Sequence, residues 1–133
     1  MHYPFSIFSR QRIMYFIFIF RAITNLTTGK DTSDEERTPL LDLVATLAYE
    51  HVDAELFSKL MEVATQYIDE ASQQKRAYRI LVSLVKNEDV TDELRETILS
   101  LIRSKKGKAK SNAEALRLEC LNLLIEKVQI SLL

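Results

Sequence analysis

The sequence QQKRAYRILVSLVK, residues 73–86, decides the fold. Apolar residues recur in it at intervals of three and four, a spacing that places side chains on one face of a helix. The opposite face carries cations, so the stretch predicts an amphipathic helix with a basic start. The apolar face holds Ala77, Tyr78, Ile80, Leu81, Leu84 and Val85, and the polar face holds Lys75, Arg76, Arg79 and Lys86.

The same apolar period continues on both sides of this stretch. Two glycines and two prolines are too few for a chain rich in β-turns, so the predicted fold class is all-α. Thr38 is the expected N-cap of the first helix, with Pro39 at its first position, and Asp53 and Thr91 are expected to cap two later helices. The predicted helices cover residues 39–50, 54–70, 72–86, 91–103 and a last segment that starts near residue 111.

An internal repeat indicates how these helices are arranged. Ala77 and Leu81 match Cys120 and Leu124 at an offset of 43 residues, and Leu43 matches Ala77 more loosely at an offset of 34. Helical pairs that repeat at such intervals are typical of HEAT and armadillo proteins. We therefore expect antiparallel hairpins over residues 39–70 and 72–103, with the last helix unpaired, stacked as an α-α superhelix of about 2.5 repeats. The chain is expected to be a fragment of a longer solenoid, with further helical repeats as partners.

The first thirty residues differ from the rest. Residues 13–20, IMYFIFIF, are too short to span a bilayer as a helix, so a membrane location is not expected. They resemble the apolar core of a signal segment, and Asn25 begins a glycosylation pattern, so secretion or membrane attachment stays an alternative. Otherwise residues 1–30 are expected to be an atypical apolar segment that forms a buried or aggregation-prone strand or helix, or a start that is not native to the protein. The predicted domain organisation is this segment, a polar linker over residues 31–38, and a helical repeat domain over residues 39–133.

Catalytic chemistry is not indicated. His2 and His51 are far apart in the sequence and have no neighbouring metal ligands, and no phosphate-binding loop or nucleophile motif occurs. The single cysteine, Cys120, lies among leucines and is expected to be a buried core residue. We expect no enzyme activity, metal, cofactor or small-molecule substrate.

Binding chemistry is indicated only by clustered cations. Although the formal net charge is −1, a basic loop follows the fourth predicted helix, and further cations begin the third. Such cations can contact phosphates and release counterions. The alternative is a loop that only aids solubility. The candidate RNA-binding residues are Arg103, Lys105, Lys106, Lys108, Lys110, Lys75, Arg76 and Arg79.

Three stretches carry a resemblance to a known family. They are QQKRAYRILVSLV, TDELRETILSLIRS and ALRLECLNLL, and together with the preceding hairpin they extend over residues 39–130. They resemble the ribosomal RNA-processing protein 12 family of nuclear HEAT-repeat proteins. The resemblance implies a non-enzymatic scaffold in the nucleus or nucleolus, able to shuttle to the cytoplasm. Its implied partners are pre-ribosomal proteins and ribosomal RNA, in rRNA processing and subunit export. The alternative function is a protein-binding adaptor of the karyopherin type that does not bind RNA.

Overall fold

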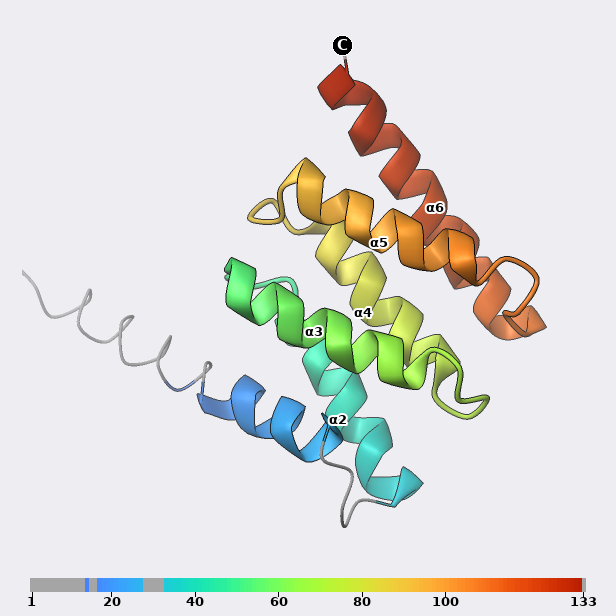
Figure 1. Cartoon of the computed structure of the whole chain (residues 1–133). Coiled ribbons are helices and arrows are strands. Elements are labelled where there is room, and N and C mark those ends of the chain that lie inside the picture. Colours follow the sequence, from blue (N-terminus) through green and yellow to red (C-terminus); the bar gives the residue numbers. More distant parts are fainter. Residues whose placement is uncertain (1–13, 15–16, 28–32, 133) are drawn as a thin grey trace, which may run out of the picture.

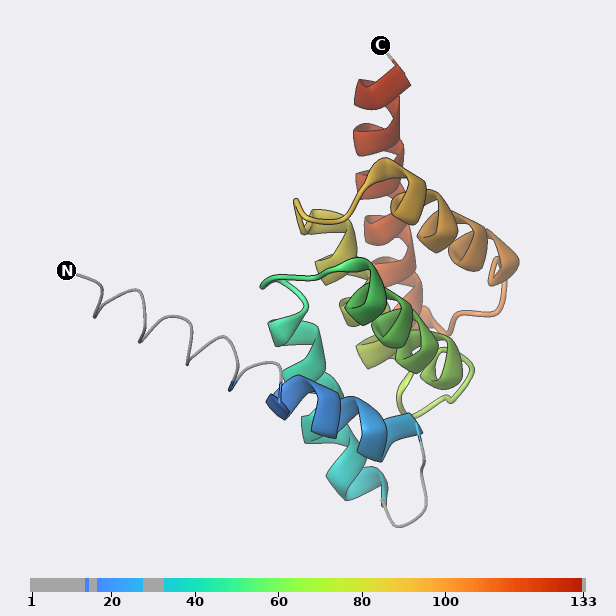
Figure 2. The same cartoon turned by 60° about the vertical axis from the view of Figure 1, so that its left-hand side comes forward.

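A computed structural model describes residue 14 and residues 17–27 and 33–132. All regular secondary structure in these ranges is helical, which confirms the predicted all-α fold, and the helices stack in two layers in the manner of a helical repeat (Figures 1 and 2). One layer holds the helix of residues 17–27, α3 and α5, and the other holds α2, α4 and α6. The labelled helices are α2 (Asp34–Leu47), α3 (Ala54–Tyr67), α4 (Gln74–Lys86), α5 (Asp92–Ser104) and α6 (Ser111–Leu132).

The pairing of helices differs from the prediction. α4 packs extensively on α3 and only slightly on α5, whereas α5 packs on α6. The hairpins are therefore α3 with α4 and α5 with α6, so α6 is not unpaired. α2 follows the helix of residues 17–27 in the same way, which gives three pairs in place of 2.5 repeats. The error arose because short connections join every helix to the next, and the connections alone do not show which neighbours form a pair.

The start of α2 also corrects the prediction. The helix begins at Asp34 with Ser33 as its N-cap, so Thr38 is not the cap and Pro39 lies inside the helix. Glu35 and Glu36 lie in the first turn, where the helix dipole favours negative charge. Pro39 removes only one backbone hydrogen bond near the helix start. Most of the predicted polar linker is therefore helical, and its residues 31 and 32 lie outside the described residues. The predicted caps Asp53 and Thr91 are confirmed, since they accept hydrogen bonds from Leu56 N and Leu94 N.

The helix of residues 17–27 belongs to the hydrophobic core. Ile19, Ala22, Ile23 and Leu26 are buried in it, and the Tyr67 hydroxyl on α3 donates a 2.6 Å hydrogen bond to the carbonyl oxygen of Leu26. Part of the segment assigned as atypical is thus an integrated helix. Residues 1–13, 15, 16 and 28–32 lie outside the described residues, including part of the predicted signal segment. None of the helices within the described ranges has the length and apolar character needed to cross a bilayer.

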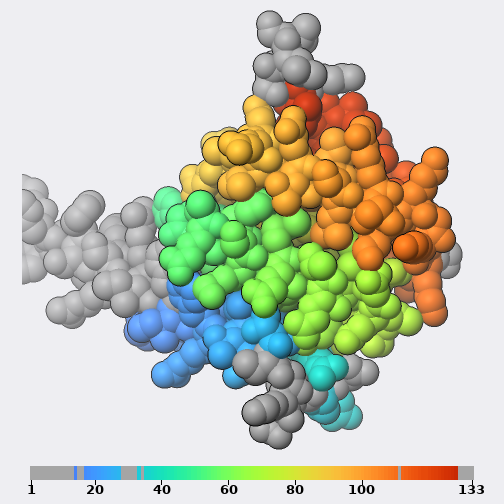
Figure 3. Space-filling view, in the orientation of Figure 1, coloured from blue at the N-terminus to red at the C-terminus, as the bar shows by residue number. Residues whose placement is uncertain are grey.

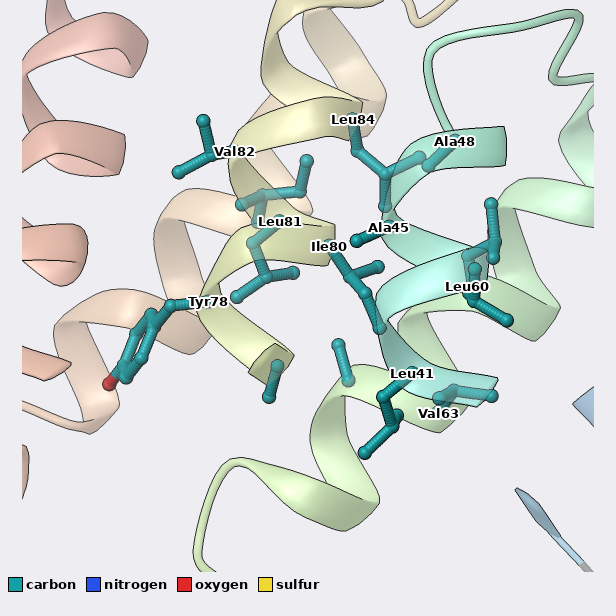
Figure 4. Close-up of a cluster of buried hydrophobic side chains, with 14 of the residues drawn as sticks. Leu41, Ala45, Ala48, Leu60, Val63, Tyr78, Ile80, Leu81, Val82 and Leu84 are labelled. Carbon is teal, nitrogen blue, oxygen red and sulfur yellow. The ribbon is translucent and has the colours of Figure 1, made fainter. Parts of the chain in front are cut away.

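α4, the helix of the opening stretch, occupies the centre of the stack. It contacts α2, α3, α5 and α6, and nearly every side chain from Ala77 to Val85 is buried. Figure 4 shows Ile80 and Leu84 directed toward α2, whereas Tyr78 and Val82 project to the opposite side. A helix packed on several sides has no wide solvent face, which explains why only a narrow polar stripe remains on α4.

The buried positions define the repeat register. Leu41, Val44 and Ala45 of α2 and its C-cap Ala48 are buried, and the residues 36 positions later in α4 are buried as well. Leu43, by contrast, is 40% exposed, so the looser match at an offset of 34 does not describe the packing. The offset of 43 between α4 and α6 agrees with burial, because Ala77, Leu81, Cys120 and Leu124 are all inaccessible. Consecutive helices of this layer are therefore structurally equivalent.

Candidate nucleic-acid interface

The connection between α5 and α6 is fixed to the start of α4. The Gln74 side chain donates to the carbonyl oxygens of Ile68 (2.9 Å) and Lys108 (3.3 Å) and accepts from the backbone N–H of Lys110 (3.0 Å). Gln74 is buried, and Ala109 between the two lysines packs against the core. Gly107, at a φ of 78°, provides the left-handed turn that leads into this segment. The basic loop is thus held in place by one buried amide.

Five of the eight predicted cations are exposed near the α5–α6 connection and the start of α4. We call them the basic end; they are Lys75, Arg103, Lys106, Lys108 and Lys110. No ion pair between residues that the structure describes involves any of them. Figure 3 shows the α5–α6 connection on the surface next to the α3–α4 connection. The structure therefore brings the loop cations close to the start of α4, as a single binding surface requires.

Lys105 has a different environment. Its Nζ lies 2.8 Å and 2.9 Å from the two carboxylate oxygens of Asp69, and its side chain is only 16% exposed. The pair joins the α5–α6 connection to the α3–α4 connection. Because the lysine neutralises Asp69, this carboxylate opposes an anion at the basic end less strongly. Lys105 thus shapes the surface without offering a free cation.

Arg76 and Arg79 do not join the basic end. Arg79 Nη1 lies 3.7 Å from Asp42 Oδ1 on α2, and Arg76 Nε lies 3.4 Å from the same atom, within ion-pair distance. Both arginines therefore face the second helix of the preceding pair. The prediction grouped them with Lys75 because they are adjacent in the sequence, but helical geometry turns them toward α2.

A groove runs across α2, α4 and α6, and the sequence did not predict it. Its volume is about 410 Å³, and its charges are paired across the helices: Arg79 with Asp42, and Lys86 with Glu119 at 3.9 Å. No local sequence pattern indicates it, because its lining residues lie in or next to three different helices. The lining residues are Asp42, Ala45, Thr46, Tyr49, Arg79, Val82, Ser83, Lys86, Leu116 and Glu119.

The buried ionisable groups lie between α4 and α6. Burial raises the pKa of the Cys120 thiol and of the Tyr78 hydroxyl to about 12 in each case, so both stay protonated at neutral pH. Nearby, the Arg117 guanidinium donates to Glu114 at 2.9–3.2 Å, and this contact lowers the pKa of the carboxyl. Cys120 is fully buried, as predicted, and a protonated buried thiol is a poor nucleophile.

The two histidines are the remaining candidate metal ligands of the sequence. His51 is an exposed residue between α2 and α3, as predicted, and its Nδ1 lies 3.3 Å from Asp89 Oδ2. Within the described ranges, no cluster of three or more His, Cys, Asp or Glu side chains has the arrangement needed to hold a metal ion. His2 lies outside these ranges.

Comparison with known proteins adds no relative. No protein-family model, no curated protein and no solved structure matches this chain.

Proposed function

We propose that this chain is a non-enzymatic helical-repeat scaffold that binds RNA through the basic end. The observation that carries the proposal is the placement of Lys106, Lys108 and Lys110, which are exposed on a connection that Gln74 fixes to α4. A fixed loop keeps its cations close together and loses less conformational entropy on binding a phosphate chain. The net charge of −1 makes the attraction local, so binding depends on this surface and not on the whole molecule.

The resemblance to the ribosomal RNA-processing protein 12 family supports a more specific version of the proposal. In that version the RNA belongs to pre-ribosomal particles, the partners include their proteins, and the site of action is the nucleus or nucleolus. QQKRAYRILVSLV is one of the stretches that carry the resemblance, and in this fold it forms most of α4, beside the basic loop.

The experiment measures RNA binding as a function of salt. A fluorescent single-stranded oligouridine is titrated with the full chain and with the variant Lys106→Gln/Lys108→Gln/Lys110→Gln. Each phosphate contact contributes a slope of about −0.7 in a plot of log affinity against log salt, so the triple variant should lose about 2 units of slope. The affinity itself should fall most at low salt.

A charge-matched variant provides the control. Lys59→Gln/Lys86→Gln/Lys127→Gln removes the same charge from α3, α4 and α6 away from the loop. It should keep nearly the full salt slope. If the two variants lose affinity equally, binding depends on net charge and the basic end is not the site. Unchanged affinity in the loop variant would reject RNA binding there.

The groove supports a second candidate function, a protein-binding adaptor of the karyopherin type. Its paired charges and the 51% exposed Tyr49 suit a polypeptide better than a phosphate chain. This function predicts that the RNA experiment fails for the wild-type chain. It also predicts that a charge reversal in the groove, Arg79→Glu, abolishes binding of a protein partner that the loop variant still binds.

A further inference from the structure

Apart from Tyr49, which lines the groove, the exposed large hydrophobic side chains of the described residues lie in or next to the first and last helical pairs. In the part of the chain that the structure describes, α3, α4 and α5 contribute none of them. A contiguous exposed apolar surface is typical of a contact surface, whereas single exposed apolar residues are not. The exposed large hydrophobic side chains are Met14, Ile17, Phe18, Leu43 and Tyr49 in or next to the first pair, and Leu118 and Ile125 on α6.

The exposed stripe of α6 corresponds to an internal interface of the stack. On α4, Tyr78 and Val82 project away from α2, and Tyr78 lies in the electrostatic field of Arg117 and Glu114 on α6. At the repeat offset of 43, these two α4 residues correspond to Leu121 and Ile125. Leu121 and Ile125 therefore lie on the side of α6 that corresponds to the side of α4 in contact with the next helix of its layer. Leu118, 44% exposed, extends this stripe by one turn.

The first end of the stack presents the opposite half of the same interface. Arg76 and Arg79 form the side of α4 that faces the preceding helix, since both approach Asp42 on α2. At the repeat offset of 36, they correspond to Leu40 and Leu43 of α2. Leu40 is partly buried and Leu43 is 40% exposed. Where α4 carries two arginines at the edge of its contact with α2, α2 thus carries two leucines.

We propose that two copies of this chain associate end to end, with the α6 stripe of one copy packed on α2 of the next. The stripe consists of Leu118, Leu121 and Ile125, and its counterpart on the partner copy is Leu40 and Leu43. The contact repeats the arrangement of α4 and α6 within the chain. It joins the apolar surface on α6 of one copy to the apolar surface on α2 of the other. Because the two surfaces differ, the contact is heterologous and does not close in a dimer, so longer assemblies form as concentration rises.

The test is sedimentation velocity on the full chain across the micromolar range. The wild-type chain should form dimers and larger species. Leu118→Glu/Ile125→Glu and, separately, Leu43→Glu should each be monomeric, because a buried carboxylate at either surface opposes packing. Asn112→Glu, which adds a charge at an exposed position on another face of α6, is the matched control and should assemble like the wild type. Far-UV circular dichroism and the thermal midpoint verify folding; if a glutamate variant unfolds, the corresponding glutamine variant replaces it.

A mixing experiment identifies the geometry. The Leu43→Glu chain keeps an intact α6 stripe, and the Leu118→Glu/Ile125→Glu chain keeps an intact α2 surface. An equimolar mixture should therefore form a heterodimer and nothing larger. A wild-type chain that stays monomeric would overturn the proposal. It would also be overturned if Leu43→Glu alone still dimerised and the mixture gained no species, since that result identifies a symmetric contact between two α6 helices.

Discussion

Single polar side chains close the ends of helices in this fold. Asn87 is 5% exposed, and its Nδ2 donates to the carbonyl oxygens of Ala48 (2.7 Å) and Glu50 (2.6 Å) at the end of α2. Arg95 in turn donates to the carbonyls of Val85 and Asn87 at the end of α4. The last carbonyls of a helix have no partner within it, so these side chains replace water. Each joins a helix end to the next part of the stack.

Replacing Asn87 should therefore be costly. Asn87→Ala leaves two carbonyl oxygens without their donor, and we expect the free energy of unfolding to fall by about 2 to 4 kcal/mol. Urea denaturation measures this value. Asn122→Ala, at an exposed position of α6, should change it by less than about 0.5 kcal/mol. Equal effects of the two substitutions would show that Asn87 does not stabilise the helix end.

Cys120 and Tyr78 predict a loss of stability at alkaline pH. Their ordinary pKa values are 9.0 and 10.0, and burial raises both to about 12 in the folded chain. At pH values between the ordinary and the raised pKa of each group, the unfolded chain releases a proton that the folded chain keeps. The free energy of unfolding therefore falls as pH rises through this range. Denaturation at a series of pH values should show this decline from about pH 9 upward.

Two substitutions separate the contributions. Cys120→Ala and Tyr78→Phe should each make the alkaline decline shallower, and together they should nearly abolish the part due to these groups. The buried Tyr78 hydroxyl has no hydrogen-bond partner among the residues that the structure describes, so Tyr78→Phe should cost less than about 1 kcal/mol at pH 7. An unchanged alkaline slope in the double variant would show that other groups cause it.

At the level of elements, the sequence predicted what depends on local spacing. The periods that define α3, α4 and α5 and the caps Asp53 and Thr91 depend on residues within one or two turns. The pairing of helices and the ion pairs of Arg76 and Arg79 with Asp42 depend on residues more than thirty positions apart, which periodicity cannot place. The basic loop was located from its composition. The buried contacts of Gln74 that fix it could not be predicted, because they join a side chain at the start of α4 to backbone groups more than thirty positions later.

For the helix of residues 17–27, the sequence left a buried helix as only one of several alternatives. Ile19, Ala22, Ile23 and Leu26 follow the helical spacing and are buried, but the continuous run of Phe and Ile before them hides the period. We expect Leu26→Ala to lower the free energy of unfolding by about 2 to 5 kcal/mol, since Leu26 is fully buried. Ile17→Ala, at a position 46% exposed, is the control and should have a much smaller effect. If Leu26→Ala left urea denaturation unchanged, this helix would not belong to the cooperative core.

At the scale of the whole molecule, the two proposed contacts occupy different surfaces. The basic end lies at the α5–α6 connection, which Gln74 fixes to the start of α4. The α6 stripe lies on the outer side of the last pair. RNA binding depends on charge and weakens with salt, while the association of apolar surfaces does not require charge. The two activities should therefore respond to different substitutions.

This independence gives a prediction for the intact chain. Lys106→Gln/Lys108→Gln/Lys110→Gln should lose RNA affinity and still assemble, and Leu118→Glu/Ile125→Glu should be monomeric and still bind one oligonucleotide per chain with the wild-type salt slope. Sedimentation velocity and fluorescence anisotropy on the same samples measure both properties. An assembly defect in the lysine variant would mean that RNA or the loop itself bridges the copies. In the wild-type chain, a long oligonucleotide should bind more tightly than a short one, because assembly aligns several basic ends and raises the effective concentration of each; the monomeric variant should lose this length dependence.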